Sequence, residues 1–242
     1  MRLTSIIIPN YNGIKYLKPC VESILIHTSS PYEIIVVDNG SDDGSIEYCE
    51  QQKLKLISLP TNCGFPAACN YGLKMAVGDS LLLLNNDTLL TRNWLDNMLR
   101  CLYSSADIGI VGPVTNYATG KQKIKEPFTS LNEMAARYND PDASKWHQVD
   151  RIVGLCFLFK RELMDRVGLM DERFSPGYVE DDDYCYRARL EGFRLMVAGD
   201  AFIYHKGGGS FRKKGRKAVR QLLHRNYAQF IAKWGVHPRS FI

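Results

Sequence analysis

Residues 62–88 read NCGFPAACNYGLKMAVGDSLLLLNNDT, and the order of side chains in this stretch decides the fold that we predict. Pro66 to Val77 indicates a helix that Gly78 ends. Ser80 to Leu84 contains four leucines in a row and indicates a strand. A continuously apolar strand is typical of a parallel sheet with both faces covered. Because Asn85-Asn86-Asp87 follows at once, the stretch predicts a buried strand with a carboxylate at its rim.

The same alternation of apolar runs and amphipathic stretches extends over the first half of the chain. The predicted strands are 5–8, 33–37, 54–59 and 80–84, and the predicted helices are 13–26, 44–52 and 66–77. Strands that alternate with helices imply βαβ units. We therefore predict an α/β fold with a Rossmann-like, open, twisted and mostly parallel sheet that is flanked by helices.

The second half of the chain is less regular. Residues 115–147 are polar, and we expect a long loop there with one helix at 132–138, since a loop of this length is usually functional or mobile. The other expected elements are helices at 93–104, 161–167 and 217–234, strands at 108–111 and 151–159, a broken strand at 194–204, and a helix that the acids at 180–183 open. Without a linker or a repeat, residues 1–242 are expected to form one domain.

Composition excludes several classes of protein. The chain has 242 residues, of which 45% are hydrophobic and 24% charged, as in ordinary globular proteins. Its seven cysteines form no CxxC pair, which argues against a disulfide framework or a zinc ribbon. No apolar run approaches the roughly 18 residues that cross a bilayer, and the N-terminus lacks a signal-peptide core. We expect a cytoplasmic protein and leave open a position at the inner face of the membrane.

Positive charge is concentrated near the C-terminus, in a basic segment at 212–225. This segment carries seven Lys and Arg residues and no acid, whereas the net charge of the whole chain is +5. Such a patch indicates an anionic partner, namely phosphates or a membrane surface. An equally weighted alternative is a solvated helix face. Nucleic acid is disfavoured because no aromatic residues are interleaved with the charges.

Polar residues follow each of the first four predicted strands. The carboxyl ends of parallel strands are where open α/β sheets bind ligands. Each segment alone could be a turn or a helix cap, but together they predict one polar crevice, formed by residues 9–13, 38–44, 60–65 and 85–88.

Two residues are candidate metal ligands. Asp87 stands at the rim of a buried strand, and a hard divalent cation takes one or two carboxylates and completes its shell with water and phosphate. His205 ends the last predicted strand, and Mn²⁺ accepts a mixed oxygen and nitrogen shell. Taken alone, His205 is better explained as a loop histidine. The glycines at 207–209 that follow do not form a GxGxxG fingerprint.

The acidic run at 180–183 is the second notable feature. At the start of a helix the dipole favours acids, and Asp183 is spaced to pair with Arg187. This does not account for Glu180 and Asp181, which are expected to precede the helix and to point into the crevice. A carboxylate there is suited to act as a general base toward a hydroxyl group.

These segments, in this order, resemble the inverting family 2 glycosyltransferases, which have the GT-A fold. The resemblance spans nearly the whole chain, and the ordered set is far more specific than any one part. The matching segments are SIIIPNYNG (5–13), EIIVVDNGSDDGS (33–45), NCGFPAACNYGLKMAVGDSLLLLNNDT (62–88), GLMDERF (168–174), EDDDYCYRARLEGFRL (180–195) and HKGGGS (205–210).

The resemblance implies a role for each matching residue. Asp38 would bind the nucleotide base, flanked by Pro9 and Tyr11, and Asn62 and Gly64 would close the site. The nucleotide-binding half would be residues 1–110, and the acceptor-binding and catalytic half residues 111–242.

The implied metal site departs from the family pattern. Asn85-Asn86-Asp87 would replace the usual DxD motif, so Asn85 or Asn86 would contact the ribose or a water. Asp87 and His205 would bind Mn²⁺ or Mg²⁺. Asp181 would be the catalytic base, and Glu180 would orient the acceptor.

The resemblance also implies the partners. The donor would be a UDP- or dTDP-linked sugar, and the acceptor a saccharide or a lipid-linked molecule in bacterial surface polysaccharide or glycolipid synthesis. Two alternatives remain open. One is a nucleotidyltransferase, which the single glycine of residues 9–13 disfavours. The other is a catalytically inactive nucleotide-sugar-binding module of a larger assembly.

Overall fold

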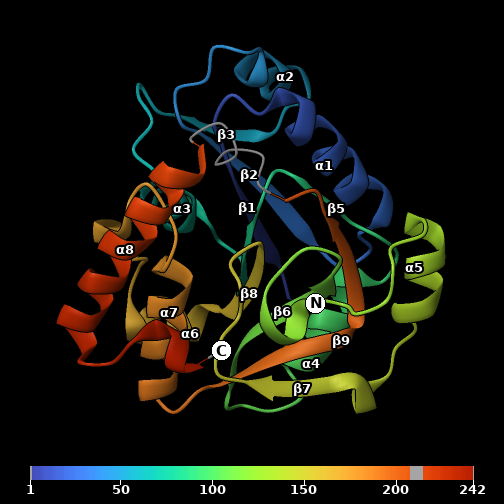
Figure 1. Cartoon of the computed structure of the whole chain (residues 1–242). Coiled ribbons are helices and arrows are strands. Elements are labelled where there is room, and N and C mark those ends of the chain that lie inside the picture. Colours follow the sequence, from blue (N-terminus) through green and yellow to red (C-terminus); the bar gives the residue numbers. More distant parts are fainter. Residues whose placement is uncertain (1, 208–214, 242) are drawn as a thin grey trace.

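A computed structural model describes residues 2–207 and 215–241 of the chain (Figure 1). The first half has the predicted alternation, and its elements begin and end within two residues of the predicted positions. They are β1 (Thr4–Asn10), α1 (Ile14–His27), β2 (Tyr32–Asp38), α2 (Ser45–Gln51), β3 (Lys55–Ser58), α3 (Phe65–Met75) and β4 (Ser80–Leu84).

The second half adds shorter and less regular elements. Its helices are α4 (Trp94–Leu102), α5 (Leu131–Tyr138), α6 (Arg161–Val167), α7 (Glu180–Leu190) and α8 (Gly215–Trp234). Its strands are β5 (Thr88–Leu89), β6 (Ile108–Thr115), β7 (Trp146–Val149), β8 (Cys156–Lys160) and β9 (Arg194–His205). Short 3₁₀ helices occur at Gly120–Gln122, Ala143–Lys145, Glu172–Phe174 and Pro238–Phe241. In the described ranges, no helix is both long and apolar enough to cross a membrane.

One sheet joins the two halves. Within the described residues it has nine strands, in the order β3-β2-β1-β4-β8-β6-β9-β5, and β7 pairs with β9 at its side. The pairs among β1 to β4 are parallel, and β8 runs antiparallel to both β4 and β6. The predicted open sheet is therefore confirmed, but it is parallel only among β1 to β4 and between β6 and β9, and the remaining pairs are antiparallel.

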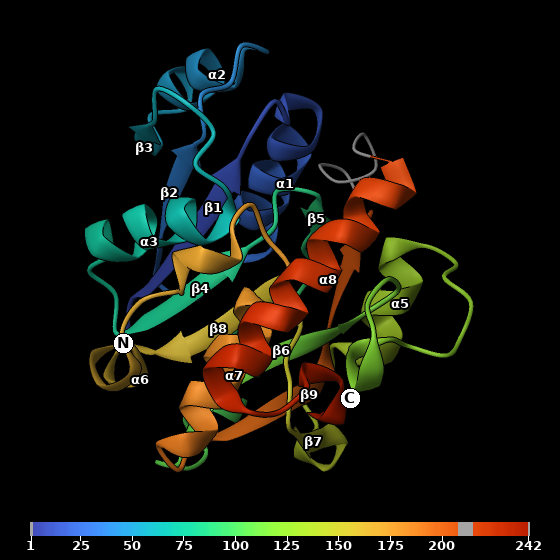
Figure 2. The same cartoon turned by 60° about the vertical axis from the view of Figure 1, so that its left-hand side comes forward.

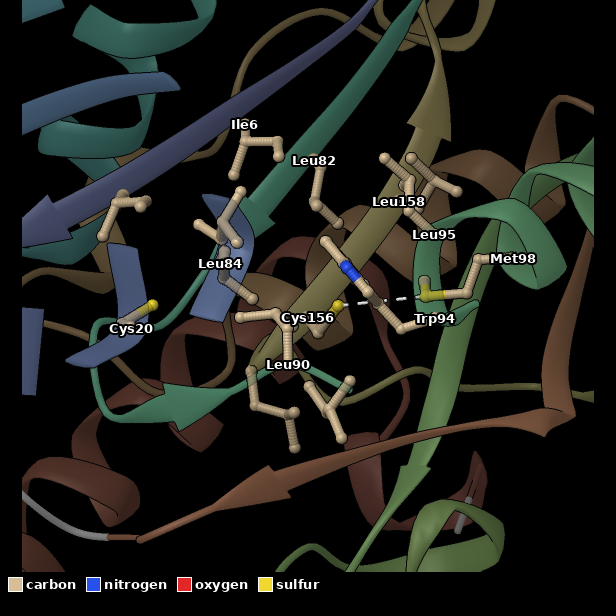
Figure 3. Close-up of a cluster of buried hydrophobic side chains, with 14 of the residues drawn as sticks. Ile6, Cys20, Leu82, Leu84, Leu90, Trp94, Leu95, Met98, Cys156 and Leu158 are labelled. Atoms are coloured by element: carbon tan, nitrogen blue, oxygen red, sulfur yellow. Dashed lines mark hydrogen bonds between the residues drawn. The ribbon is translucent and has the colours of Figure 1, made fainter. Parts of the chain in front are cut away.

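Helices cover both faces of this sheet. Ile6 and Ile8 of β1 pack with α1 and α4 on one face, and Ile7 packs with α3, α6 and α7 on the other. Figure 1 shows α1 to the right of the central strands and α3, α6 and α7 to the left. Figure 3 shows the first layer, where Trp94 and Met98 of α4 lie against the strands. Each fully buried apolar side chain of this size contributes about 1.5–3 kcal/mol.

The structure corrects the expectations for residues 115–159. A strand was predicted at 151–159, but β8 begins at Cys156, so residues 151–155 do not belong to a strand. Their backbone N–H groups donate to side chains instead of a neighbouring strand: Ile152 to Cys185, Val153 to Gln122 and Gly154 to Asp181. The expected loop at 115–147 holds the predicted helix, as α5, and also the start of β7.

Two further expectations are corrected at the C-terminal side. Glu180 and Asp181 do not precede the helix, because α7 begins at Glu180 and both residues lie in its first turn. The last strand is not interrupted, since β9 runs from Arg194 to His205; its irregularity is a shift of register opposite Pro113 and Val114.

Candidate functional site

The ends of β1, β2 and β4 form a buried polar network, which we call the strand-end cluster: Asn10, Asp38 and Asn86. Because β1 lies between β2 and β4, Asn10 reaches both neighbours. Its Nδ2 donates to the Asp38 carboxylate at 2.9 Å, and its Oδ1 accepts from Asn86 Nδ2 at 2.7 Å. Sequence reasoning predicted the meeting of these strand ends but did not single out Asn10, whose signal is its register opposite Asp38.

The loops beyond these strands are tied together. Asp38 is fully buried and also accepts from the backbone N–H of Ser41 at 2.8 Å and from its hydroxyl at 2.7 Å. Asp43 accepts from the N–H of Ile14 at 2.9 Å, at the start of α1. Tyr11, by contrast, is 43% exposed. The loop after β2 is therefore fixed against the loop after β1, and Tyr11 faces outward beside them.

The loop before α3 contacts a distant segment. Asn62 Oδ1 accepts from the N–H of Gly64 at 2.9 Å. Gly64 has φ +92°, and a Cβ there would lie 2.9 Å from Pro176 Cα, so only glycine fits this close approach. Phe65 N–H donates to Pro176 O at 3.0 Å. Asn62 and Gly64 are thereby placed beside the loop that leads into α7.

Asp87 and His205 lie together, as predicted. The short strand β5 pairs with β9 so that Thr88 is opposite His205. His205 Nε2 is 3.2 Å from Asp87 Oδ1, and its Nδ1 is 2.8 Å from the carbonyl oxygen of Tyr117. Burial alone lowers the pKa of His205, but the hydrogen bond and charge of Asp87 raise it above its ordinary value.

This pair fits a divalent cation that completes its shell with non-protein ligands. A protonated Nδ1 of His205 donates to the Tyr117 carbonyl, so that Nε2 donates to Asp87 when the ring is charged and offers its lone pair to a cation shared with Asp87 when the ring is neutral. Among the described residues, no group of three or more His, Cys, Asp and Glu side chains is placed to hold a metal. Two donors are what Mg²⁺-like sites take when phosphates and water supply the rest.

Three acids in the first turn of α7 lie beside Arg151, which precedes β8. We call these residues the acidic cluster: Glu180, Asp181, Asp182 and Arg151. All three acids are buried. Asp181 Oδ2 accepts from Gly154 N–H at 2.9 Å and lies 4.0 Å from Arg151 Nη2. Arg151 Nε also pairs with Asp182. Sequence reasoning missed Arg151, because nothing in its neighbourhood marks it as the partner of acids 30 residues away.

The acids of this cluster differ in environment. Burial, and then the charge of Asp181, raises the pKa of Glu180 well above its ordinary value. Within the described part of the chain, Glu180 Oε2 has no hydrogen-bond partner. Burial, and then Asp181, also raises the pKa of Asp182, to about 8, although Arg151 opposes the shift. Burial therefore favours the protonated form of Glu180 compared with an exposed glutamate.

The backbone before α7 adopts a rare conformation. Tyr178 has φ +71° and Val179 has φ +78°, although neither is glycine. Positive φ is unusual for any L-residue and is an outlier for a β-branched one. Such strain is concentrated at functional sites, where the surrounding structure holds it.

Residues 117–119 contact both the metal-ligand pair and the acidic cluster. Tyr117, whose carbonyl binds His205, also places its ring 5.6 Å from the His205 ring. Two residues further on, Thr119 Oγ1 accepts from Arg151 Nη1 of the acidic cluster at 3.4 Å. This segment therefore connects the two groups of predicted residues.

Asp183 is structural, as the helix-pairing interpretation predicted. It is fully buried and accepts from Arg187 Nε at 2.9 Å, as the spacing required. It also accepts from Lys233 Nζ at 2.6 Å and Trp234 Nε1 at 2.8 Å, both on α8. Asp183 thus fastens α8 to α7.

The basic segment is described only in part. Arg212, Lys213 and Lys214 lie outside the described residues, as do two of the glycines at 207–209. Lys217 and Arg220 are exposed on α8. Arg225 donates to the carbonyl of Ser175, so it is not merely solvated.

Comparison with known proteins identifies a family that matches this chain. The model of the family described as glycosyl transferase family 2 matches residues 5–168. Glycosyltransferase GlyG of Streptococcus pneumoniae is 26% identical over 228 residues, which cover 87% of this chain and 73% of GlyG.

Two solved structures share the fold. Mannosyltransferase PcManGT from Pyrobaculum calidifontis, in complex with GDP-Man and Mn²⁺, superposes with a TM-score of 0.71 at 20% identity, over 95% of this chain. S. aureus TarS 1-349 in complex with UDP-GlcNAc gives 0.66 at 18% identity, over 96% of this chain. The chain spans 64% of the PcManGT chain and 67% of the TarS chain. These likenesses confirm the predicted GT-A fold.

The family match covers more than half of the chain and includes the strand-end cluster and Asp87. The motif order, the sheet and the family match agree, and this chain belongs to glycosyl transferase family 2.

Proposed function

We propose that this protein transfers a sugar from a nucleotide-diphosphate sugar to an acceptor hydroxyl group, with inversion at the anomeric carbon. The observation that carries the proposal is the pairing of Asp87 with His205, which residues 117–119 and Arg151 connect to a buried carboxylate, Asp181. One feature suits a diphosphate with its metal, and the other suits a hydroxyl group that must lose a proton.

The donor is proposed to bind over the ends of the first strands, in the half formed by residues 1–110. Tyr11 is exposed and suited to stack against a base, with Pro9 beside it, and Asn62 and Gly64 border the same side. Asp38 is proposed to contact the base. Because it is buried, it would have to exchange its hydrogen bonds with Ser41 for one to the ligand.

Asp87 and His205 Nε2 are proposed to hold Mn²⁺ or Mg²⁺, and Asn85 and Asn86 to contact the ribose or a water. A bound divalent cation supplies neutralisation of the charge that develops on the departing diphosphate. The carbonyl of Tyr117 orients the imidazole for this task, as hydrogen-bond acceptors behind metal-binding histidines generally do.

The acceptor is proposed to bind at the acidic cluster, in the half formed by residues 111–242. Asp181 removes the proton of the acceptor hydroxyl while that oxygen attacks the anomeric carbon and the bond to the diphosphate breaks. Gly154 N–H donates to Asp181 Oδ2 and fixes the orientation of this basic carboxylate. Glu180, whose Oε2 has no hydrogen-bond partner among the described residues, is proposed to orient the acceptor through a hydrogen bond. In-line attack by a single displacement gives inversion.

The identity of the substrates is proposed more broadly. UDP- and dTDP-sugars are the expected donors, and the acceptor is expected to be a saccharide or lipid-linked molecule of bacterial surface polysaccharide or glycolipid synthesis. The exposed Lys217 and Arg220 are suited to an acceptor phosphate or to an anionic membrane surface.

Calorimetry of nucleotide binding tests the proposal. UDP, dTDP and GDP are titrated with Mn²⁺, with Mg²⁺ and with EDTA, into wild type, Asp87→Ala and Asp107→Ala. Asp107 pairs with Arg194 just before β6 begins, at the end of the strand away from the site, and serves as the control. We expect metal-dependent binding that Asp87→Ala abolishes and Asp107→Ala preserves. Failure of every nucleotide to bind wild type in any metal would refute the donor site.

A further inference from the structure

Asn226 of α8 is a fully buried amide that binds the loop before α7. Its Nδ2 donates to the carbonyl oxygens of Phe174 at 2.9 Å, Gly177 at 3.0 Å and Tyr178 at 2.8 Å. Its Oδ1 accepts from Arg225 Nε at 3.0 Å and from Arg225 Nη2 at 2.8 Å. One side chain therefore gathers three carbonyl groups that are about 50 residues away in sequence.

The carbonyls that Asn226 binds belong to the strained part of the chain. Gly177 and Tyr178 immediately precede Val179, and Tyr178 and Val179 are two consecutive non-glycine residues that both have positive φ. Each such residue costs about 1–3 kcal/mol unless its surroundings over-determine it. Buried carbonyls without a donor add a comparable penalty. The side-chain amide of Asn226 supplies a hydrogen-bond donor to these carbonyls and, by binding them, restrains the backbone of the strained residues.

The next residues along the chain are the acids of the candidate site. Glu180 and Asp181 follow Val179 directly and open α7. Figures 1 and 2 both show α8 beside α7. The carboxylate of Asp183, in the first turn of α7, bonds to Lys233 and Trp234 at the far end of α8. Asn226 bonds to the loop itself, beside Arg225, which donates to the carbonyl of Ser175.

We propose that Asn226 is a positioning residue for the transfer reaction: it holds Tyr178 and Val179 in the conformation that aims Glu180 and Asp181 at the acceptor. The proposal rests on the proposed function of these two acids. Asn226 touches no substrate. Its loss therefore displaces the acids and leaves the donor side, which the first strands build, unchanged.

The exchange Asn226→Asp tests this, because it keeps the size of the side chain and replaces the donor by an acceptor. Asn97→Asp is the matched control: Asn97 is equally buried, and its Nδ2 donates to the carbonyls of Asn139 and Asp200, far from α7. Both variants lose stability. Asn226→Ser, which retains one donor, replaces Asn226→Asp if the latter does not fold.

Two measurements separate positioning from stability. In Asn226→Asp we expect faster amide hydrogen exchange confined to residues 174–183, and kcat for nucleotide release from UDP-sugars lower by about 10- to 100-fold, as small misplacements of catalytic groups produce. KM for the donor and the Kd of UDP with Mn²⁺ should stay within about twofold. Asn97→Asp should leave both exchange at 174–183 and kcat unchanged.

Equal effects of the two variants on exchange, or an unchanged kcat in Asn226→Asp, would overturn the proposal. A wild type that releases nucleotide from no UDP-, dTDP- or GDP-sugar would contradict the proposed function instead. In that case the exchange comparison still decides whether Asn226 holds the loop.

Discussion

The strand-end cluster and the acidic cluster are held together in different ways. Asn10 and Asp38 end adjacent strands, Asn86 follows the end of a third, and Asn10 bonds directly to both of the others. In the acidic cluster, Asp181 depends on Arg151 and Gly154 of the β7–β8 connection and, through the loop before it, on α8. The order of the strands alone assembles the first cluster. The second cluster requires tertiary contacts among the β7–β8 connection, the start of α7 and α8.

We expect the strand-end cluster to serve donor binding and the acidic cluster to serve proton removal from the acceptor. Of the substitutions considered, Asp181→Asn should then have the largest effect on the rate. Removing the general base should lower kcat by about 10²–10⁴-fold, while UDP with Mn²⁺ binds as in wild type. Nucleotide release and calorimetry measure the two quantities.

Asp200→Asn is the control for Asp181→Asn. It changes an equally buried carboxylate that accepts from Trp146 at 2.7 Å, so it affects folding and not the rate of the folded enzyme. Asp181→Asn with a normal kcat would remove Asp181 from the role of base.

Gly13→Ala should act on the other cluster. Gly13 has φ −126°, so alanine is allowed by the backbone, but its Cβ would clash with Asn86 Nδ2 and separate it from Asn10. We expect the free energy of unfolding to fall by about 1–3 kcal/mol, because a buried hydrogen bond is broken. In calorimetry, nucleotide binding should weaken by a factor of about 5 or more.

Gly168→Ala controls for a general effect of replacing glycine. A Cβ there meets no atom within 4 Å, and its cost comes from the positive φ alone. Equal nucleotide affinities in wild type and Gly13→Ala would show that the strand-end cluster does not shape the donor site.

The contrast between the two clusters also explains which elements and site residues could be predicted from the sequence. The strands from 4 to 84 were predicted because each is a short apolar run between turn residues, and Asp87 was found because it follows one of them. Its partner His205 was found for the same reason, at the end of the last strand. Local pattern is sufficient wherever a side chain's position follows from the strand that carries it.

The pattern fails where side chains replace backbone partners. Residues 151–155 have a strand-like composition, but their N–H groups donate to Cys185, Gln122 and Asp181. Asn226 and Arg151 likewise act through segments about 50 and 30 residues away. No local rule indicates these contacts, since each depends on where the sheet brings distant loops.

The last effect expected is on stability as a function of pH, and it involves the acidic cluster. The pKa of Asp182 is about 8 in the folded protein, because of burial and then the charge of Asp181, against an ordinary value near 4. From about pH 4 to pH 8 the unfolded chain therefore loses this proton while the folded protein keeps it. Unfolding becomes easier as pH rises through this window, by at most about 1.4 kcal/mol per pH unit from this one group.

Asp182→Asn removes that titration and keeps the shape of the side chain, while Arg151 retains Asp181 as its partner. Urea unfolding at pH 5, 6, 7 and 8 should show a flatter dependence for Asp182→Asn than for wild type. Asp42→Asn, an exposed substitution at the strand-end side, should follow the wild-type curve. Parallel curves for wild type and Asp182→Asn would mean that Arg151 keeps Asp182 ionised in the folded state. The two clusters would then differ in how they are assembled but not in how they respond to pH.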